Sequence, residues 1–168
     1  MKIKSKQTQM KNLKKIMFFA ITVFTLTMAT SCSSDDSKDE DENSTTTDFI
    51  KFKYNDKSYS FEPSVLTSLS VNILGSSGEG NTYKRVSLWL PLNASVGTHP
   101  IVYNLSELET TYQATFFYDT EFSNANATSG TVNITKATAE RIEGTFSFSG
   151  TQNDKTFTVT EGSFSVER

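Results

Sequence analysis

Apolar and polar side chains alternate with a period of two from about residue 48 to the C-terminus. This alternation is typical of β-strands that bury one face. Clusters of Gly, Asn, Asp and Ser separate the alternating segments, and Asn55-Asp56 is the first of these turn signals. The apolar positions of the successive segments are Ile50, Phe52 and Tyr54; Tyr59 and Phe61; Leu69, Val71 and Ile73; Val86, Leu88, Leu90 and Leu92; Ile101 to Tyr103; Tyr112, Ala114, Phe116 and Tyr118; Val132 and Ile134; Ile142, Phe146 and Phe148; and Phe157, Val159, Phe164 and Val166. The pattern predicts an antiparallel all-β domain of about eight or nine short strands, folded as a β-sandwich or a flattened barrel.

The last alternating segment changes phase partway along its length. Phe157 and Val159 carry odd numbers, whereas Phe164 and Val166 carry even ones, so one uninterrupted strand cannot place both pairs on the same face. Glu161-Gly162 lies between the two pairs, and glycine readily adopts the positive φ that a bulge requires. The sequence therefore predicts a bulge or a tight turn at Gly162.

The chain before this domain begins with a basic stretch followed by an apolar one. Residues 1–31 contain six lysines and no acidic residue, and residues 16–29 (IMFFAITVFTLTMA) are mostly apolar. This run is shorter than the roughly 20 residues that span a bilayer as a helix. A basic region, a short apolar region and small residues before a cleavage point predict a secretory signal peptide over residues 1–31. Translation from Met10 would give a signal of more ordinary length, so both Met1 and Met10 stay open as the start.

Cys32, the single cysteine of the chain, directly follows the small residues of this signal. The segment resembles the bacterial lipoprotein signal, which ends in an obligatory cysteine. Ala29 and Ser31 occupy places where Leu and Gly or Ala are usual, a relaxed form familiar in lipoproteins of the Bacteroidetes group. The resemblance implies cleavage before Cys32, lipidation of that residue and anchoring in the outer membrane. Two or more acyl chains make such an anchor stable, because each buried CH₂ contributes about 0.8 kcal/mol.

An acidic spacer follows the lipidation site. Residues 33–47 (SSDDSKDEDENSTTT) contain six acids, one lysine and no apolar side chain, so residues 32–47 are predicted to form a disordered tether. Acids this close to the cysteine resemble a signal that exports lipoproteins to the cell surface, and surface and periplasmic faces both stay open. Without residues 1–31 the chain has 10 basic and 19 acidic residues, a formal charge of −9. This charge disfavours nucleic acid as a partner.

Three strand-like segments of the C-terminal half carry a family resemblance. They are residues 129–135 (SGTVNIT), 142–148 (IEGTFSF) and 159–164 (VTEGSF), and Gly97-Thr98 fits the same layout although His99 replaces an aromatic residue. The series is similar to small flavobacterial lipoproteins grouped as a domain of unknown function, DUF6252. The resemblance implies a β-rich exported domain and supplies no catalytic residues.

Motifs of catalysis and metal binding are absent from the sequence. It contains no G-x-S-x-G, P-loop, H-E-x-x-H or C-x-x-C motif, and with one cysteine and one histidine it predicts no metal site and no cofactor. A Ser-His-Asp site would have to use His99, which lies between Thr98 and Pro100 at a predicted loop-to-strand junction. A paired-carboxylate hydrolase needs two acids brought together by the fold. The acids available for such a pair are Glu107, Glu109, Asp119, Glu121 and Glu143.

Two aromatic residues fall off the predicted core faces. Trp89 alternates with Leu88 and Leu90, and Phe117 with Phe116 and Tyr118, so both point away from the core. Aromatic side chains there can form a platform for a sugar or a protein, or be covered without function. Our leading hypothesis is a membrane-anchored, non-enzymatic module that binds a glycan, a peptide or an envelope protein. The alternatives are a small secreted hydrolase and a structural or inhibitory envelope lipoprotein.

Overall fold

A computed structural model describes residues 47–168, and within them the chain folds into eleven strands and two short 3₁₀ helices. The six-stranded sheet has the order β2 (Lys57–Phe61), β1 (Phe49–Tyr54), β11 (Lys155–Glu167), β10 (Arg141–Gln152), β9 (Ser129–Ala137) and β6 (Gly97–Pro100). The five-stranded sheet has the order β3 (Pro63–Thr67), β4 (Ser70–Ser77), β5 (Lys84–Pro91), β7 (Gln113–Tyr118) and β8 (Phe122–Asn126). The helices are η1 (Gly80–Thr82) and η2 (Leu105–Glu107).

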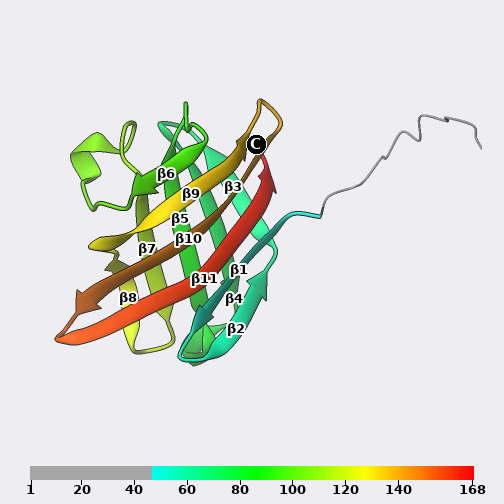
Figure 1. The fold of residues 1–168 in the computed structure, drawn as a ribbon. Helices are drawn as coiled ribbons and strands as arrows, with labels where there is room; N and C mark the ends of the chain where they lie inside the picture. Colours follow the sequence, from blue (N-terminus) through cyan, green and yellow to red (C-terminus); the bar gives the residue numbers. More distant parts are fainter. Residues whose placement is uncertain (1–46) are drawn as a thin grey trace, which may run out of the picture. The chain divides into compact units, whose positions relative to one another are not determined.

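The two sheets lie face to face as two layers (Figure 1). Neighbouring strands are antiparallel throughout both sheets. In the described part no named strand of one sheet pairs with the other sheet, and an isolated parallel bridge connects Ile101, after β6, to Tyr112, before β7. The prediction of an antiparallel all-β domain is therefore confirmed, and of its two forms the structure adopts the sandwich. Among residues 47–168, no helix is both long and apolar enough to cross a membrane.

The core fills the space between the sheets with the side chains that the alternation placed on one face. The largest side chains among those with less than 2% exposure are Phe116, Phe122, Phe157, Phe164, Ile50, Ile73, Leu88, Leu90, Ile134 and Ile142. Burying such a side chain stabilises the fold by roughly 1.5–3 kcal/mol relative to leaving it exposed. The buried side chains of the two sheets thus face one another, as expected from strands that bury every second residue.

Tight turns close one end of the sandwich, which is at the bottom of Figure 1. Asn55 and Asp56 both have positive φ, 48° and 60°, and connect β1 to β2, which confirms the predicted turn. Asn153 and Asp154, at 53° and 61°, connect β10 to β11 in the same way. Positive φ at both central residues is the geometry of a two-residue hairpin loop, and Asn and Asp tolerate it better than most residues.

The predicted bulge is present in β11, but its positive φ belongs to Glu161, at 49°, and not to Gly162. The pairing with β10 shifts between Phe146, opposite Gly162, and Phe148, opposite Val159, so one extra residue of β11 lies between them. The assignment of the positive φ to Gly162 is therefore wrong. Glycine is needed at position 162 for a different reason. A Cβ atom there would overlap the ring of Phe146, the residue that pairs with Gly162 on β10.

The structure has more strands than predicted because three edge strands lack a clear alternation. β3 and β8 are five-residue edge strands of one sheet, and β6 is an edge strand of the other. The sequence placed a strand at residues 101–103, which is wrong: β6 lies just before them and only Ile101 forms an isolated bridge, with Tyr112. Pro100 ends β6, and an edge strand tolerates proline because one side needs no backbone donor.

Two leucines of the predicted core rows lie outside the core. Leu69 immediately precedes β4 and is 58% exposed, and Leu92 immediately follows β5 and is 45% exposed. The alternation of apolar residues continues one step beyond each strand, whereas the sheet that would bury them ends. The prediction that both belong to the core is therefore wrong.

The predicted signal peptide (residues 1–31) and tether (residues 32–47), apart from its last residue, lie outside the described residues. The same holds for Cys32. The first strand of the described part, β1, begins at Phe49.

Candidate binding surface

The outer faces of the two sheets differ in chemistry. Over β9, β10 and β11, the outer face of the six-stranded sheet forms an open trough of about 400 Å³, which is lined by polar and apolar groups and includes the carboxylate-bearing Glu161. Its lining residues include Thr131, Asn133, Thr145, Ser147 and Ser163. The outer face of the five-stranded sheet carries both aromatic residues predicted as ligand contacts, Trp89 and Phe117. That face is therefore the one on which a binding site was predicted.

Trp89 lies near the middle of this outer face. It stands on β5 between Leu88 and Leu90, both 1% exposed, and is itself half-buried. Strand register places one row of side chains across the sheet: Leu66 on β3, Asn72 on β4, Trp89 on β5 and Gln113 on β7. The prediction that Trp89 points away from the core is confirmed by this register.

The connection between β6 and β7 folds over the Gln113 end of this row. The Gln113 side chain is 3% exposed and bonds the connection twice, donating from Nε2 to the Asn104 carbonyl (2.6 Å) and accepting at Oε1 from the Asn104 N–H (3.2 Å). Asn104 in turn caps η2, because its Oδ1 accepts from the Ser106 N–H (3.1 Å) and hydroxyl (2.7 Å). A buried amide with its donors and acceptor paired fixes the loop firmly on the sheet.

A pocket of about 100 Å³ lies between this connection and the sheet. Trp89 forms one wall, and Tyr103, Leu105 and Leu108 of the connection form the other side. Tyr103 is 47% exposed and Leu105 63% exposed, so both offer apolar surface to a ligand. The polar groups of the lining come from Gln113, Thr115 and Asn126. Apolar and aromatic walls with a few placed polar groups are the usual make-up of a small-ligand site.

Phe117 lies apart from this pocket. It occupies the same outer face of β7, but it pairs with Arg85, whereas Trp89 pairs with Gln113. The two aromatic residues are therefore four positions apart along the strands, about 13 Å at the usual rise per residue. Phe117 packs edge-on against Tyr83, with ring centroids 5.1 Å apart. The structure places both predicted residues on one face and does not bring them together as a platform.

His99 makes contacts of a structural kind. Its ring stacks on Tyr112 with centroids 4.1 Å apart and an angle of 10° between the planes, and its Nε2 lies 2.9 Å from the Ser95 carbonyl oxygen. These contacts hold β6 against the start of β7. Neither partner is a carboxylate, so the contacts of His99 do not form the base of a Ser-His-Asp site.

The five acids proposed for a carboxylate pair are distributed over three parts of the domain. Glu107 and Glu109 belong to the β6–β7 connection, Asp119 and Glu121 to the β7–β8 turn, and Glu143 to β10. Lysines neutralise two of them: Lys155 lies 3.9 Å from Glu121 and Lys136 lies 3.3 Å from Glu143. Within residues 47–168, no group of three or more His, Cys, Asp or Glu side chains could hold a metal ion.

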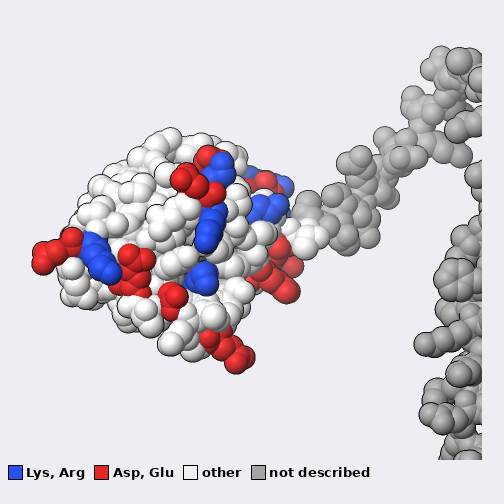
Figure 2. Space-filling model, turned by 90° about the horizontal axis from the view of Figure 1, so that it is seen from below, with Lys and Arg blue, Asp and Glu red and all other residues white. Residues whose placement is uncertain are grey.

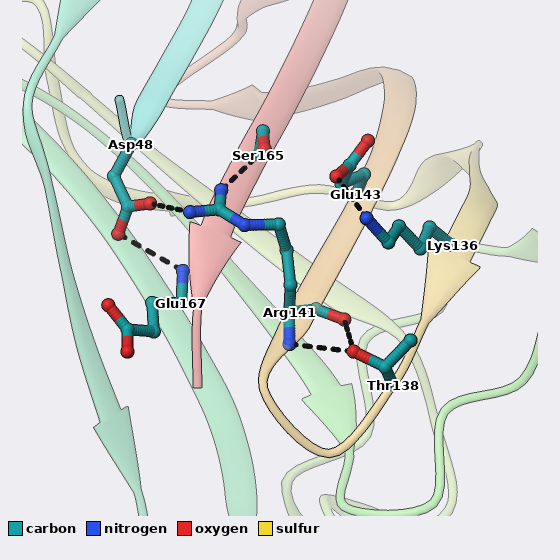
Figure 3. A network of polar contacts seen from close by, with 7 residues as sticks. All are labelled: Asp48, Lys136, Thr138, Arg141, Glu143, Ser165 and Glu167. Atoms are coloured by element: carbon teal, nitrogen blue, oxygen red, sulfur yellow. Dashed lines mark hydrogen bonds and ion pairs between the residues drawn. The ribbon is translucent and has the colours of Figure 1, made fainter. Parts of the chain in front are cut away.

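A polar network fixes the point where the chain enters the domain (Figure 3). Arg141 on β10 donates from Nη2 to Oδ1 of Asp48 (2.9 Å) and from Nη1 to the Ser165 hydroxyl (2.7 Å). The second carboxylate oxygen of Asp48 accepts from the Glu167 N–H (3.0 Å). The Arg141 side chain is only 15% exposed, so its ion pair is screened less by water than a surface pair. This junction ties the chain just before β1 to the last strand.

A tyrosine cluster lies at the turn end of the molecule. The hydroxyls of Tyr59 and Tyr118 are 3.2 Å apart and share a hydrogen bond. Burial of Tyr59, together with this bond and the nearby Tyr118 and Tyr54 hydroxyls, raises the pKa of Tyr59 to about 12. Burial and the charge of Glu121 also raise the pKa of Tyr54 above its ordinary value. The phenols of Tyr59 and Tyr54 are thus held in their neutral form.

The pocket also contains residues that the sequence did not reveal. Tyr103, Leu105 and Leu108 lie in a connection without periodicity, and Gln113 occupies the first position of β7. The available signal is weak: four apolar residues within positions 102–108 of a segment that contains no regular strand. Their convergence with Trp89 depends on the way the connection folds back on the sheet, which strand patterns do not encode.

The chain matches the model of a known protein family. A protein-family model described as "Domain of unknown function (DUF6252)" matches residues 57–166, from β2 to the last strand. Among curated proteins and among solved structures, nothing matches. The match covers about two thirds of the chain and agrees with the resemblance carried by its C-terminal strands.

Proposed function

We propose that this chain, which belongs to the DUF6252 family, is an exported outer-membrane lipoprotein, anchored through Cys32, that carries a non-enzymatic binding module. The signal-like residues 1–31, the cysteine that follows them and the acidic spacer support the anchor. The Trp89 pocket carries the proposal of binding, because it combines aromatic walls, exposed apolar side chains and polar groups at one fixed place. The sequence favours no nucleic-acid partner, since the charge without residues 1–31 is −9.

The size and chemistry of the pocket limit what it can bind. A volume of about 100 Å³ admits one sugar ring or one side chain and not a whole oligomer. The face of Trp89 or Tyr103 can pack on the apolar face of a sugar or on an aliphatic side chain, while Thr115 and Asn126 offer hydrogen bonds. A glycan, a peptide or a segment of an envelope protein would each insert one such group. The rest of the ligand would lie along the outer face of the five-stranded sheet.

The proposal is tested in two arms, the first with the full chain and the second with the chain that begins at Cys32, which contains every strand of the described residues. In the first arm, bacteria that express the full chain are fed tagged palmitate. We expect the chain to carry the tag, and Cys32→Ser to abolish it. An untagged wild-type chain that is expressed and exported would reject the lipid anchor.

In the second arm, the chain is titrated with xylan, mannan and chitin oligosaccharides and with a casein digest. Trp89 is the single tryptophan, so its emission reports directly on the pocket. We expect one probe class to shift the emission, and Tyr103→Ala to weaken that binding at least tenfold. The matched control Phe117→Ala removes the other outer aromatic ring and should bind as the wild type does.

Three outcomes contradict the binding module and separate its alternatives. Absence of any response to every probe favours a structural or inhibitory lipoprotein. Release of reducing ends or of new amino groups from a probe, lost when one of the acids or His99 is replaced, would instead establish a hydrolase. Equal weakening by Tyr103→Ala and Phe117→Ala would place the ligand outside the pocket.

A further inference from the structure

Exposed aliphatic side chains gather at the end of the sandwich opposite the tight turns. They are Leu66 and Leu69 around the β3–β4 turn, and Leu92 and Val96 in the β5–β6 connection, with exposures of 62%, 58%, 45% and 64%. The two segments are neighbours, because Ser70 at the start of β4 pairs with Pro91 at the end of β5. We call this surface the apolar end.

The β5–β6 connection that carries Leu92 and Val96 is held in place. Ala94, between them, is 7% exposed, and its N–H donates to the Pro91 carbonyl (3.0 Å). Arg168 at the C-terminus donates from Nη2 to the Leu92 carbonyl (2.6 Å). The exposed side chains are therefore presented by a fixed backbone, although their burial in the core would be favourable.

The two segments that carry these side chains contain no charged residue, and the nearby charges come from the C-terminus and the β9–β10 turn, where Arg168 donates to the Leu92 and Glu140 carbonyls. Residues 63–78 and 86–106 contain no Asp, Glu, Lys or Arg, although 21% of the whole chain is charged. Ser, Thr and Asn accompany the exposed aliphatic residues instead. These two segments therefore add no ionised group that would lose its hydration on leaving water, and moving charges out of water is the largest desolvation cost.

The chain from Cys32 enters the domain beside this surface. Asp48 is bonded to Glu167, and the next residue, Arg168, is bonded to Leu92, so two contacts link the entry point to the apolar end (Figure 3 shows the first). Only residues 33–46 separate Cys32 from the first described residue. Even fully extended, such a segment spans at most about 50 Å. The apolar end is thus kept within reach of whatever holds Cys32.

We infer that the apolar end rests on the lipid surface in which Cys32 is anchored, with Leu66, Leu69, Leu92 and Val96 at the boundary between headgroups and acyl chains. This inference rests on the lipid anchor of the proposed function. A covalent tether makes the second contact intramolecular, so a few aliphatic side chains suffice where they would not recruit a free protein. The turns at Asn55-Asp56 and Asn153-Asp154 then face away from the bilayer, whereas Glu140 of the β9–β10 turn and Arg168 lie beside the apolar end. Since Leu66 and Trp89 lie two strands apart, about 10 Å, the pocket would hold its ligand close to the membrane.

The single cysteine allows a direct test. The chain that begins at Cys32 is coupled through its thiol to a maleimide lipid in phosphatidylcholine vesicles, and amide hydrogen exchange is compared with that of the same chain capped with N-ethylmaleimide in solution. We expect exchange at residues 66–70 and 92–96 to slow at least threefold on vesicles. Exchange at the turns 55–56 and 119–121 should not change.

Two double variants sharpen the result. Leu69→Ser with Leu92→Ser should remove the protection on vesicles, and circular dichroism should show the same fold. Lys57→Ser with Lys155→Ser, at the opposite end, should keep it. Absence of protection in the wild type, protection of the charged turns instead, or equal protection in the dissolved chain, which would indicate a second copy as the partner, would each overturn the inference.

This design separates the inference from the proposed function. Chemical coupling supplies the anchor regardless of processing in the cell, so unprotected loops on vesicles reject the membrane contact alone. Failure of the palmitate experiment would instead reject the native anchor, and the pocket titration depends on neither result.

Discussion

The two ends of the sandwich are built on different principles. At the charged end, short turns connect neighbouring strands, and Asn and Asp occupy their positive-φ positions: Asn55-Asp56, Asp119 and Asn153-Asp154. Seen from below, acidic and basic side chains lie beside one another there (Figure 2). At the apolar end, the longer connections 92–96 and 101–112 and the β3–β4 turn expose aliphatic residues, and Glu140 of the short β9–β10 turn and Arg168 lie beside them. The first end has the features of efficient folding and solubility, and the second has those of a surface that meets something else.

The side chains of the core also differ between the two ends. Next to the charged turns, aromatic rings contact one another, and Phe116 is central because it lies within 6.3 Å of several rings, measured between centroids: Phe52, Tyr54, Tyr118, Phe122 and Phe157. Towards the apolar end the pairs are aliphatic, such as Val71 with Leu90 and Ile142 with Val166. Aromatic contacts add about 0.5–1.5 kcal/mol each beyond the area they bury. Stability should therefore be concentrated at the charged end.

The largest effect is expected from Phe116→Ala, which removes a fully buried ring from this cluster. Loss of its burial and the cavity left behind should lower the free energy of unfolding by about 3–5 kcal/mol. Phe117→Ala is the matched control, because Phe117 is adjacent in sequence, points to the outer face and contacts Tyr83, so about 1 kcal/mol is expected. Urea unfolding of both variants, followed by circular dichroism, measures the difference. Similar losses for the two residues would contradict a core concentrated on the inner face.

A smaller loss in the free energy of unfolding is expected at alkaline pH, through ionisation of Tyr59. The folded state holds its pKa at about 12, whereas an unfolded tyrosine ionises near 10. Between these values the unfolded chain binds fewer protons, so stability is complete below pH 10 and falls as the pH rises towards 12. Because Tyr59 is close to the surface, we expect a loss on the order of 1–2 kcal/mol, below the limit set by a full shift of this size.

Tyr59→Phe identifies this contribution. Urea unfolding at pH 7, 10, 11 and 12 should show a shallower decline for the variant than for the wild type, while other groups that titrate in this range contribute to both. Parallel curves for the two proteins would show that the Tyr59–Tyr118 contact does not hold the phenol neutral.

Much of the charged end could be predicted from the sequence, because its turns and its bulge are determined by residues that are neighbours in the chain. Asn55-Asp56 between two alternating segments specifies a hairpin, and the change of phase between Val159 and Phe164 specifies a bulge. The residue with positive φ could not be predicted, since glycine is the usual choice and the structure places Glu161 there. Gly162 is needed for a contact across the strands, with Phe146, which becomes visible only once the register is known.

The apolar end could be predicted less well, because its structure depends on contacts between residues that are distant in the sequence. The pattern placed Leu69 and Leu92 in the core, since alternation does not mark the residue at which a sheet stops. The pattern likewise placed Trp89 on the correct face but did not identify its aromatic neighbour. Phe117 lies four positions away along the strands, and the aromatic residue that lines the pocket with Trp89 is Tyr103, from a connection without periodicity. Contacts between a connection and a sheet depend on the folded path of the chain, so the pocket required the structure.

The smallest effect is expected at the apolar end itself, from Leu92→Ala. Leu92 is largely exposed, so its truncation should change the free energy of unfolding by no more than about 0.5 kcal/mol. Leu90→Ala is the matched control, because Leu90 lies two residues earlier in the same alternation and is 1% exposed. Its truncation should lower the free energy of unfolding by about 2–5 kcal/mol. Urea unfolding of the two variants locates the boundary between core and surface. A loss above 2 kcal/mol for Leu92→Ala would return this leucine to the core and remove it from the surface available for a partner. A neutral result would mean that its exposed side chain contributes nothing to folding, which is the condition for assigning it to contact with something outside the domain.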